Sequence, residues 1–397
     1  MATLVLTSSR VDALRSGYDL RVAQLCALIP DELHLMVAPL YPLPPRTPTI
    51  DTSGLFAGVT ECPAILGDRL SPRRHLRLDN HRYLSRGRPR GFAEARSTLA
   101  TVITRGHIDR IVVFGWEIAE LVAGVDCPKV LDICDSAALT QRRALAHAGW
   151  SLRGALELYR VRRTEARLPA LFDQVTTVSA VDSAHLVALS GRPGNVSTVP
   201  NGVADAYLAP MPPPGDRRGV VFWGNLDFAP NADALSYFFA EVWYPALRAA
   251  RVHVEVIGGN APAWLQELAR HEPLVRLSGF VSDLRAAVTR YPVMVNPMRT
   301  GSGLKNKVLE AFGLGVVVVS TPRGVEALPA AKHGEHLVIS ADSAGFAAAV
   351  LDLLDDPGRR ERLRSNANAL LHERYRWPVT TRPWCALFDT AVGSRGA

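Results

Sequence analysis

Short apolar runs that alternate with longer stretches of helical period constrain the fold of this chain more than any other feature of its sequence. In the first half these runs occupy residues 2–7, 33–38, 111–114, 129–133 and 175–178. In the second half they occupy residues 219–224, 252–259, 275–280, 292–297 and 316–321. Short apolar strands separated by helices are typical of parallel sheets that are covered on both faces. We therefore predict an α/β chain with two doubly wound, Rossmann-like domains that face each other across a cleft.

A linker separates the two series of runs. The segment NGVADAYLAPMPPPGDRRG, residues 201–219, is rich in Pro, Gly and Asp and has no sustained apolar period. With 397 residues and 48% hydrophobic content, the chain is long enough to bury two cores. We predict a first domain over 1–208, a linker over 209–218, a second domain over 219–378 and a closing helix over 379–397 that returns to the first domain.

Composition argues against several classes of protein. The opening residues MATLVLTSSRVDAL lack the basic start and long apolar stretch of a signal peptide. The best candidate for a membrane-spanning segment, 111–125, contains Glu117 and Glu120. The five cysteines are odd in number and lack paired spacing, which indicates neither a disulfide framework nor a structural zinc site. We expect a cytoplasmic protein whose cysteines are small buried residues.

One βαβ unit carries the features of an anion site. Residues 292–321 give a strand, a loop with Gly301 and Gly303, a helix from about Leu304 to Leu314, and a second strand. Glycine lets the backbone approach a ligand closely, and the N-terminus of a helix offers unpaired N–H groups and a positive dipole end. We expect Ser302 to cap the helix and the loop to bind a diphosphate group.

The same helix carries two of the four lysines in the chain, Lys305 and Lys307. At about 100° per residue, Lys307 and Glu310 lie about 60° apart, on the side opposite the apolar residues. A carboxylate beyond a phosphate loop can accept two hydrogen bonds from a ribose diol, while a lysine offsets the diphosphate charge. The spacing alone also fits an ordinary Lys–Glu pair on a surface helix.

The order of these features resembles the retaining family-4 glycosyltransferases of the GT-B fold, whose second domain carries a Glu-x7-Glu element before a Gly-x-Pro-Val-Val strand. Glu310 matches the second glutamate, but Ser302 stands at the position of the first. The chain is therefore more similar to a branch with Gly-x-Gly-x-Lys-x-Lys-Val-Leu-Glu-Ala, which includes bacterial polysaccharide and natural-product sugar transferases. Further segments match in the family's order, at residues 175–189, 195–210, 220–235 and 374–388.

The resemblance implies a binding site for a nucleotide diphosphate sugar in the second domain. Many members grip the diphosphate with an Arg and a Lys, and the segment VVFWGNLDFAPNADAL at 220–235 lacks this pair. We therefore assign the phosphate charges to Lys305 and Lys307. The full set of expected donor-binding residues is Gly224, Asn225, Gly301, Ser302, Gly303, Leu304, Lys305, Lys307, Glu310 and Gly324.

In the first domain the resemblance implies acceptor-side residues at Gly17, Asp132 and Asp135. Gly17 belongs either to the family's glycine-containing loop or to an ordinary turn. Cys134 replaces the histidine of the family's His-Asp pair, whereas Asp135 remains. Asp132 and Asp135 follow a strand, where each would either orient or deprotonate an acceptor hydroxyl or cap the next helix.

The chemistry implied by the resemblance is sugar transfer with retained anomeric configuration, in which the leaving diphosphate helps to take the acceptor proton. The expected catalytic residues are Lys305, Lys307 and Asp135. The chain has no metal-binding Asp-x-Asp motif, so we expect neither a metal nor a cofactor, with the nucleotide sugar as co-substrate. The alternatives are a sugar-nucleotide epimerase of the same fold and a catalytically silent GT-B binding subunit.

The segment 71–105 is a basic patch, with nine arginines against Asp79 and Glu94. It is either a solvated face or a surface that meets a phosphate-bearing acceptor or the anionic inner membrane. Because it lacks an aromatic stacking platform or a recognisable module, we do not expect nucleic acid as a partner.

Overall fold

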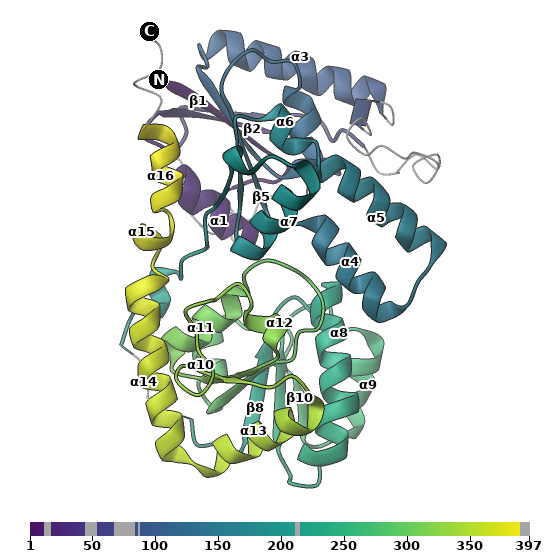
Figure 1. Cartoon of the computed structure of the whole chain (residues 1–397), viewed down its shortest axis with the longest axis vertical. Helices are drawn as coiled ribbons and strands as arrows, with labels where there is room; N and C mark the ends of the chain where they lie inside the picture. The colour runs from purple at the N-terminus through teal and green to yellow at the C-terminus, as the bar shows by residue number, and fades with distance from the viewer. Residues whose placement is uncertain (12–16, 44–53, 67–83, 86–87, 211–214, 390–397) are drawn as a thin grey trace. The chain divides into compact units, whose positions relative to one another are not determined.

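The computed structural model describes residues 1–11, 17–43, 54–66, 84–85, 88–210 and 215–389 (Figure 1). The chain divides into two compact units. The first contains residues 1–145, 149–200 and those from Thr381 on, and the second contains residues 146–148 and 201–380. Within the described parts of the chain, every helix is too short or too polar to cross a bilayer.

The first unit is built on a seven-stranded parallel sheet in the order β3-β2-β1-β4-β5-β6-β7. Its strands are β1 (Ala2–Thr7), β2 (Glu32–Val37), β3 (Gly58–Glu61), β4 (Arg110–Phe114), β5 (Lys129–Cys134), β6 (Gln174–Thr177) and β7 (Val196–Thr198). Five of them coincide with the apolar runs, so the predicted parallel sheet is confirmed. The runs do not predict β3 and β7, because these two outer strands are short and none of their residues is fully buried.

Helices cover both faces of the first sheet (Figure 1). They are α1 (Gly17–Cys26), α3 (Pro89–Arg105), η3 (Trp116–Val122), α4 (Ala137–Ala148), α5 (Leu152–Glu165), α6 (Leu168–Leu171), α7 (Ala180–Ser190) and η4 (Pro193–Asn195). Alternate residues of β1 enter different cores: Leu4 and Leu6 pack on one face of the sheet and Val5 on the other. This alternation is what a strand buried on both faces requires.

The second unit contains a six-stranded parallel sheet in the order β10-β9-β8-β11-β12-β13. The strands are β8 (Gly219–Trp223), β9 (His253–Ile257), β10 (Val275–Leu277), β11 (Val293–Asn296), β12 (Val317–Ser320) and β13 (Val338–Ile339). Val220 and Phe222 pack on one face of this sheet, and Val221 and Trp223 on the other. The second predicted parallel sheet is therefore also confirmed.

The second unit also contains helices, of which η5 precedes the first strand of the sheet. They are η5 (Asp205–Tyr207), α8 (Ala229–Tyr237), the π-helix η6 (Phe238–Leu247), α9 (Ala263–His271), α10 (Leu284–Val288), α11 (Asn306–Leu314), α12 (Pro322–Val325), α13 (Ser343–Asp355), α14 (Pro357–Arg374) and α15 (Trp377–Thr380). The long helix α14 packs against α11. Asn368 of α14 donates a hydrogen bond to the carbonyl oxygen of Phe312 in α11 at 3.4 Å.

The first unit ends at Pro200 rather than at residue 208, because the residues in between pack inside the second unit. The N–H of Val203 donates to the carbonyl oxygen of Tyr375 at 2.8 Å. Tyr207 lies so close to α11 that a Cβ added to Gly313 would lie 2.3 Å from the Tyr207 carbonyl oxygen. The chain leaves the second unit again after Thr380.

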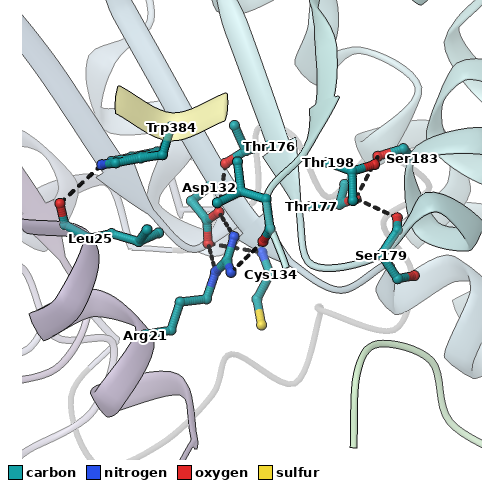
Figure 2. A network of polar contacts seen from close by, with 11 residues as sticks. Arg21, Leu25, Asp132, Cys134, Thr176, Thr177, Ser179, Ser183, Thr198 and Trp384 are labelled. Atoms are coloured by element: carbon teal, nitrogen blue, oxygen red, sulfur yellow. Dashed lines mark hydrogen bonds and ion pairs between the residues drawn. The ribbon is translucent and has the colours of Figure 1, made fainter. Parts of the chain in front are cut away.

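The closing helix α16 (Arg382–Asp389) belongs to the first unit. Its Trp384 is fully buried and donates from Nε1 to the carbonyl oxygen of Leu25 at 3.0 Å (Figure 2). The ring of Trp384 also lies 6.0 Å from that of Phe114 in β4. These contacts attach α16 to both α1 and the sheet.

All five cysteines are unpaired thiols. Cys26 and Cys62 are buried, as expected. For Cys127, Cys134 and Cys385 the expectation is wrong, because each is partly exposed. Cys127 lies in the bend before β5, Cys134 ends β5 and Cys385 lies in α16.

The predicted basic patch falls partly outside the described residues, which omit 71–83 and 86–87. Its described part consists of residues 84–85 and Arg88 with helix α3. Leu84, one of its apolar members, is 3% exposed and packs in the core of the first unit. It is therefore a structural residue and not part of an exposed surface.

Candidate functional site

A glycine-containing loop and the helix α11 that follows it form the centre of the site in the second unit. Gly301 and Gly303 have φ angles of 83° and 72°, and Gly315, which ends α11, has 69°. L-residues with a side chain rarely adopt such angles, so the three glycines fix where the loop turns and where the helix stops. The predicted order of strand, loop, helix and strand is thus confirmed.

The start of the helix differs from the prediction. Lys305 and not Ser302 occupies the N-cap position, and its side chain makes no capping hydrogen bond. Ser302 is instead buried within the loop, and its carbonyl oxygen accepts a hydrogen bond from the Lys305 Nζ. The same Nζ lies 3.3 Å from the carbonyl oxygen of Gly303. Because Gly303 holds a positive φ, helical geometry begins only after it.

Lys307 lies on α11 in contact with the first turn of α8 and with β8. Its Nζ donates to Asn231 Oδ1 at 2.8 Å and lies 4.0 Å from the centre of the Phe222 ring. Burial, with a further contribution from the charge of Lys305, lowers the pKa of Lys307 to about 7. An ammonium group with this pKa can change its charge when an anion binds beside it.

Glu310 is held by an indole. The Nε1 of Trp223, at the end of β8, donates to Glu310 Oε2 at 2.7 Å. Burial raises the pKa of Glu310, whereas the Trp223 hydrogen bond and the charge of Lys307 lower it. The electrostatic coupling of Lys307 and Glu310 agrees with the prediction that both lie on one side of the helix.

The loop after β8 brings Gly224 and Asn225 to the same place. A Cβ added to Gly224 would lie 2.9 Å from Asn231 Nδ2 and 3.4 Å from the Lys307 Nζ. Asn231 Nδ2 in turn donates to the carbonyl oxygen of Asn225 at 2.8 Å. Asn231 therefore joins the two halves of the site, a role that sequence reasoning missed. Its place in the Pro-Asn pair at the start of α8 is a sequence signal that could have identified it.

The glycine loop of α11 contacts the same segment. A Cβ added to Gly301 would lie 3.3 Å from two side-chain carbons of Pro230. Leu304 is partly buried and packs against the core on this side of the sheet. The structure thus brings together all the predicted donor-side residues except Gly324.

Gly324 is the predicted donor-side residue that does not join this group. Its N–H donates to Thr321 Oγ1 at 3.2 Å, as the first turn of α12, and its carbonyl oxygen accepts from Asn296 Nδ2 at 3.1 Å. A Cβ at this position would lie 2.3 Å from both Asn296 Nδ2 and Ser320 Oγ. Gly324 is therefore required for packing, and its amide is not available to a ligand.

In the first unit, Asp132 forms a fully buried ion pair with Arg21 (Figure 2). Arg21 Nε and Nη2 donate to the two carboxylate oxygens of Asp132 at 2.9 and 2.5 Å. Thr176 Oγ1 donates to the same carboxylate at 2.6 Å, and Arg21 Nη1 donates to the carbonyl oxygen of Val199 at 2.7 Å. The prediction that Asp132 faces an acceptor is therefore wrong, because its oxygens bind Arg21 and Thr176 inside the unit.

Cys134 and Asp135 follow directly at the end of β5. Cys134 has a φ of 60°, and the pairing of β5 with β6 shifts register between Asp132 and Cys134. Figure 2 shows the sulfur of Cys134 pointing away from the Arg21–Asp132 pair. Burial raises the pKa of the Cys134 thiol, so it is uncharged at neutral pH. Asp135 is partly exposed beyond this bend.

Tyr18 and Glu117 are two further polar residues near this edge of the sheet that sequence reasoning did not assign to the site. Parallel sheets bind ligands where the strand order reverses, here between β1 and β4. Gly115, directly after β4, has a φ of 98°, and a Cβ on it would lie 2.8 Å from Glu117 Oε2 and 3.5 Å from the Tyr18 hydroxyl. The Tyr18 hydroxyl is buried and has no hydrogen-bond partner among the described residues.

Gly17 is the exposed first residue of α1 and precedes Tyr18. Burial raises the pKa of Tyr18 well above its usual range, so its hydroxyl keeps its proton and can act as a donor. Of the predicted acceptor-side residues, Asp135 directly follows β5 and Gly17 begins α1, and their role toward an acceptor stays a prediction. Across the described residues there is no group of three His, Cys, Asp or Glu that could hold a metal ion.

Comparison with known proteins finds a similarity that lies within the second unit. Residues 217–356 match the family model described as Glycosyl transferases group 1. A curated protein of Klebsiella pneumoniae, "Uncharacterized 44.6 kDa protein in cps region", is 27% identical over 165 residues. The matched region is 39% of this chain and spans only 42% of that protein.

Solved structures resemble the whole chain. Sucrose-phosphate synthase from Thermosynechococcus elongatus has a TM-score of 0.74 at 14% identity, with 98% of each chain covered. Anabaena HepE in complex with UDP and glucose has a TM-score of 0.68 at 14% identity, with 98% of this chain and 99% of that one covered. WaaG, a glycosyltransferase involved in lipopolysaccharide biosynthesis, has a TM-score of 0.64 at 13% identity, with 97% and 98% covered. The chain has the GT-B fold.

Proposed function

We propose that this GT-B chain, whose second unit carries a glycosyl transferases group 1 domain, moves a sugar from a nucleotide diphosphate sugar to an acceptor hydroxyl with retention of anomeric configuration. One observation carries the proposal: the Lys307 ammonium lies 2.8 Å from Asn231, which ties α11 to the loop after β8. A half-buried cation is thereby placed next to two loops that turn at glycines with positive φ angles, Gly301 and Gly303 in one and Gly224 in the other. Such a combination suits a diphosphate.

The diphosphate would lie at the N-terminus of α11. There it would meet the backbone of Gly301 and Gly303, the helix dipole, and the charges of Lys305 and Lys307. Gly224 and Asn225 would contact it from the loop after β8. The Anabaena protein, whose structures contain UDP and UDP-glucose, supports a nucleotide sugar as the ligand class to test first.

Glu310 would hold the ribose. Trp223 occupies Glu310 Oε2 and so orients the carboxylate. The remaining lone pairs of the carboxylate would accept hydrogen bonds from the ribose hydroxyls. A carboxylate suits this role better than an amide, because both of its oxygens are acceptors.

In the proposed reaction the bond between the anomeric carbon and the leaving phosphate oxygen breaks while a bond to the acceptor oxygen forms on the same face. The acceptor proton passes to the leaving diphosphate, so no protein nucleophile is needed. Lys305 and Lys307 would stabilise the charge that develops on the diphosphate. Asp135, with Tyr18 and Glu117 nearby, would orient the acceptor hydroxyl.

We further propose a glycan or lipid-linked glycan as acceptor, which the name of the Klebsiella protein, from a cps region, supports.

We also propose that the reaction needs no metal. Release of UDP from UDP-sugars, measured with and without a chelator, tests the metal proposal, since full loss of activity with chelator would contradict it. Formation of an epimerised sugar without acceptor, or UDP-sugar binding without any turnover, would instead contradict sugar transfer.

A further inference from the structure

The helical hairpin α4–α5 exposes large apolar side chains at its turn. Trp150 and Leu152 are each 75% exposed, and Tyr159 in α5 is 47% exposed. Figure 1 shows α4 and α5 as neighbouring helices that run in opposite directions and are joined by this turn. The exposed Trp150 lies directly before Ser151, whose side chain caps α5 by accepting from the Gly154 N–H at 3.1 Å. The cap fixes the turn that presents Trp150 and Leu152.

The exposed residues continue along one stripe of α5. At about 100° per residue, Leu152, Tyr159 and Arg163 lie within about 40° of one another on the helix. Arg163 Nη1 donates to the Tyr159 hydroxyl at 3.0 Å, so its guanidinium lies at the polar end of this side chain. The stripe therefore changes from apolar at the turn to aromatic and cationic farther along the helix.

The hairpin is strongly basic. Residues 137–167 contain seven arginines and two glutamates, and of these arginines Arg142, Arg153, Arg162 and Arg163 are exposed. Glu165, the last residue of α5, is fully buried, and its carboxylate accepts hydrogen bonds from Ser136 Oγ and the Ala138 N–H at the start of α4. Glu157 is only half-buried, but it lies toward Arg160 at 3.7 Å. The exposed charge around Trp150 and Leu152 is therefore positive.

We propose that the α4–α5 hairpin docks on an anionic lipid bilayer. Trp150 and Leu152 would enter the headgroup region, while Arg153, Arg162 and Arg163 would pair with lipid phosphates. Trp is favoured at the membrane–water interface, and exposed apolar side chains surrounded by cations are what interfacial helices use. Charge complementarity selects an anionic surface as the occupant. Because α4 starts two residues after Asp135, the contact would connect the bilayer with the acceptor end of the first sheet.

The test measures co-sedimentation of the full chain with vesicles of phosphatidylcholine alone and with vesicles that also contain phosphatidylglycerol. We expect the chain to bind only the vesicles that contain phosphatidylglycerol. The variant W150S/L152S should reduce the partition coefficient about tenfold or more, because two exposed apolar anchors are lost. The variant R153Q/R162Q/R163Q should also weaken binding and make it less sensitive to salt.

A matched control carries the same kinds of change on the second unit. F280S/R270Q removes an aromatic side chain that is 89% exposed and an arginine that is 62% exposed, and it should bind vesicles like the parent chain. Thermal melting and UDP-glucose binding monitor folding of each variant. The proposal is overturned if no vesicle binds, if phosphatidylcholine alone binds equally well, or if the hairpin variants and the control bind alike. A change of W150S/L152S from dimer to monomer with unchanged vesicle binding would also overturn it, in favour of a self-interface.

Discussion

At the residue scale, Lys307 is the most informative position in the site. Its ammonium is held by Asn231 and the Phe222 ring, and its pKa is lowered to about 7 chiefly by burial. A bound diphosphate adds negative charge next to this group, which favours the protonated form and raises the pKa. Donor binding should therefore be linked to proton uptake.

We predict that the protein takes up about one proton when it binds UDP-glucose at pH 8 and almost none when it binds at pH 6. The sign follows from the lowered pKa, because the free protein has already lost the Lys307 proton at pH 8 and still carries it at pH 6. Titration calorimetry in buffers of different ionisation enthalpy measures this number. In the variant K307R the cation is permanent, so binding should persist without proton uptake. Equal uptake by the parent chain and K307R would exclude Lys307 as the linked group.

The buried ion pair between Arg21 and Asp132 contributes to the stability of the first unit. Arg21→Met leaves the Asp132 carboxylate buried with Thr176 and without its cation, so we predict a loss of about 3 to 5 kcal/mol in unfolding free energy for the first unit. The double variant R21M/D132L removes both charges and should recover most of this loss. Thermal and urea unfolding of the full chain test both. A loss below about 1 kcal/mol in R21M would contradict a strong buried pair.

At the element scale, glycines decide how closely the loops of the second unit approach each other. Gly258, directly after β9, has a φ of 154°, and a Cβ on it would lie 1.9 Å from the carbonyl oxygen of Gly224. The neighbouring Gly259 has open space at the corresponding position. The two residues provide a test in which one methyl group is added at a crowded and at an open position.

We predict that Gly258→Ala destabilises the second unit by about 1 to 3 kcal/mol and weakens UDP-glucose binding, because the loop with Gly224 must move. Gly259→Ala should change stability and binding far less. Thermal unfolding and titration calorimetry on both variants provide the comparison. Equal effects of the two substitutions would show that loop spacing at Gly224 does not control the site.

Several features of these elements could be predicted from sequence and others could not. The end of α11 follows from Gly315, whereas its start does not follow from Ser302, because the backbone angle at Gly303 delays the helix. The role of Asp132 also could not be predicted, since its partner Arg21 lies 111 residues away in the chain. A carboxylate after a strand has the same local pattern whether it faces a ligand or a buried arginine.

At the scale of the whole molecule, two series of apolar runs were sufficient to predict two parallel sheets. The edge strands β3, β7 and β13 escaped prediction because they are short and carry little apolar pattern. The unit boundary at Pro200 depends on contacts of residues 201–208 with α11 and with the segment that follows α14, which no local composition reveals. Tyr18 comes together with Gly115 and Glu117 only through the order of strands in the first sheet, so only the fold could identify this group.

The central claim is that the loop and helix from Gly301 to Glu310 bind a nucleotide diphosphate sugar. Titration calorimetry with UDP-glucose and related donors, on the parent chain and on K307A and E310A, tests it most directly. The matched controls are K332A and E335A, which remove an exposed Lys–Glu pair elsewhere in the second unit. We predict that K307A and E310A each weaken the best donor about tenfold or more, as expected for charge-assisted contacts, and that the controls bind like the parent chain. Unchanged donor affinity in both K307A and E310A would contradict the account.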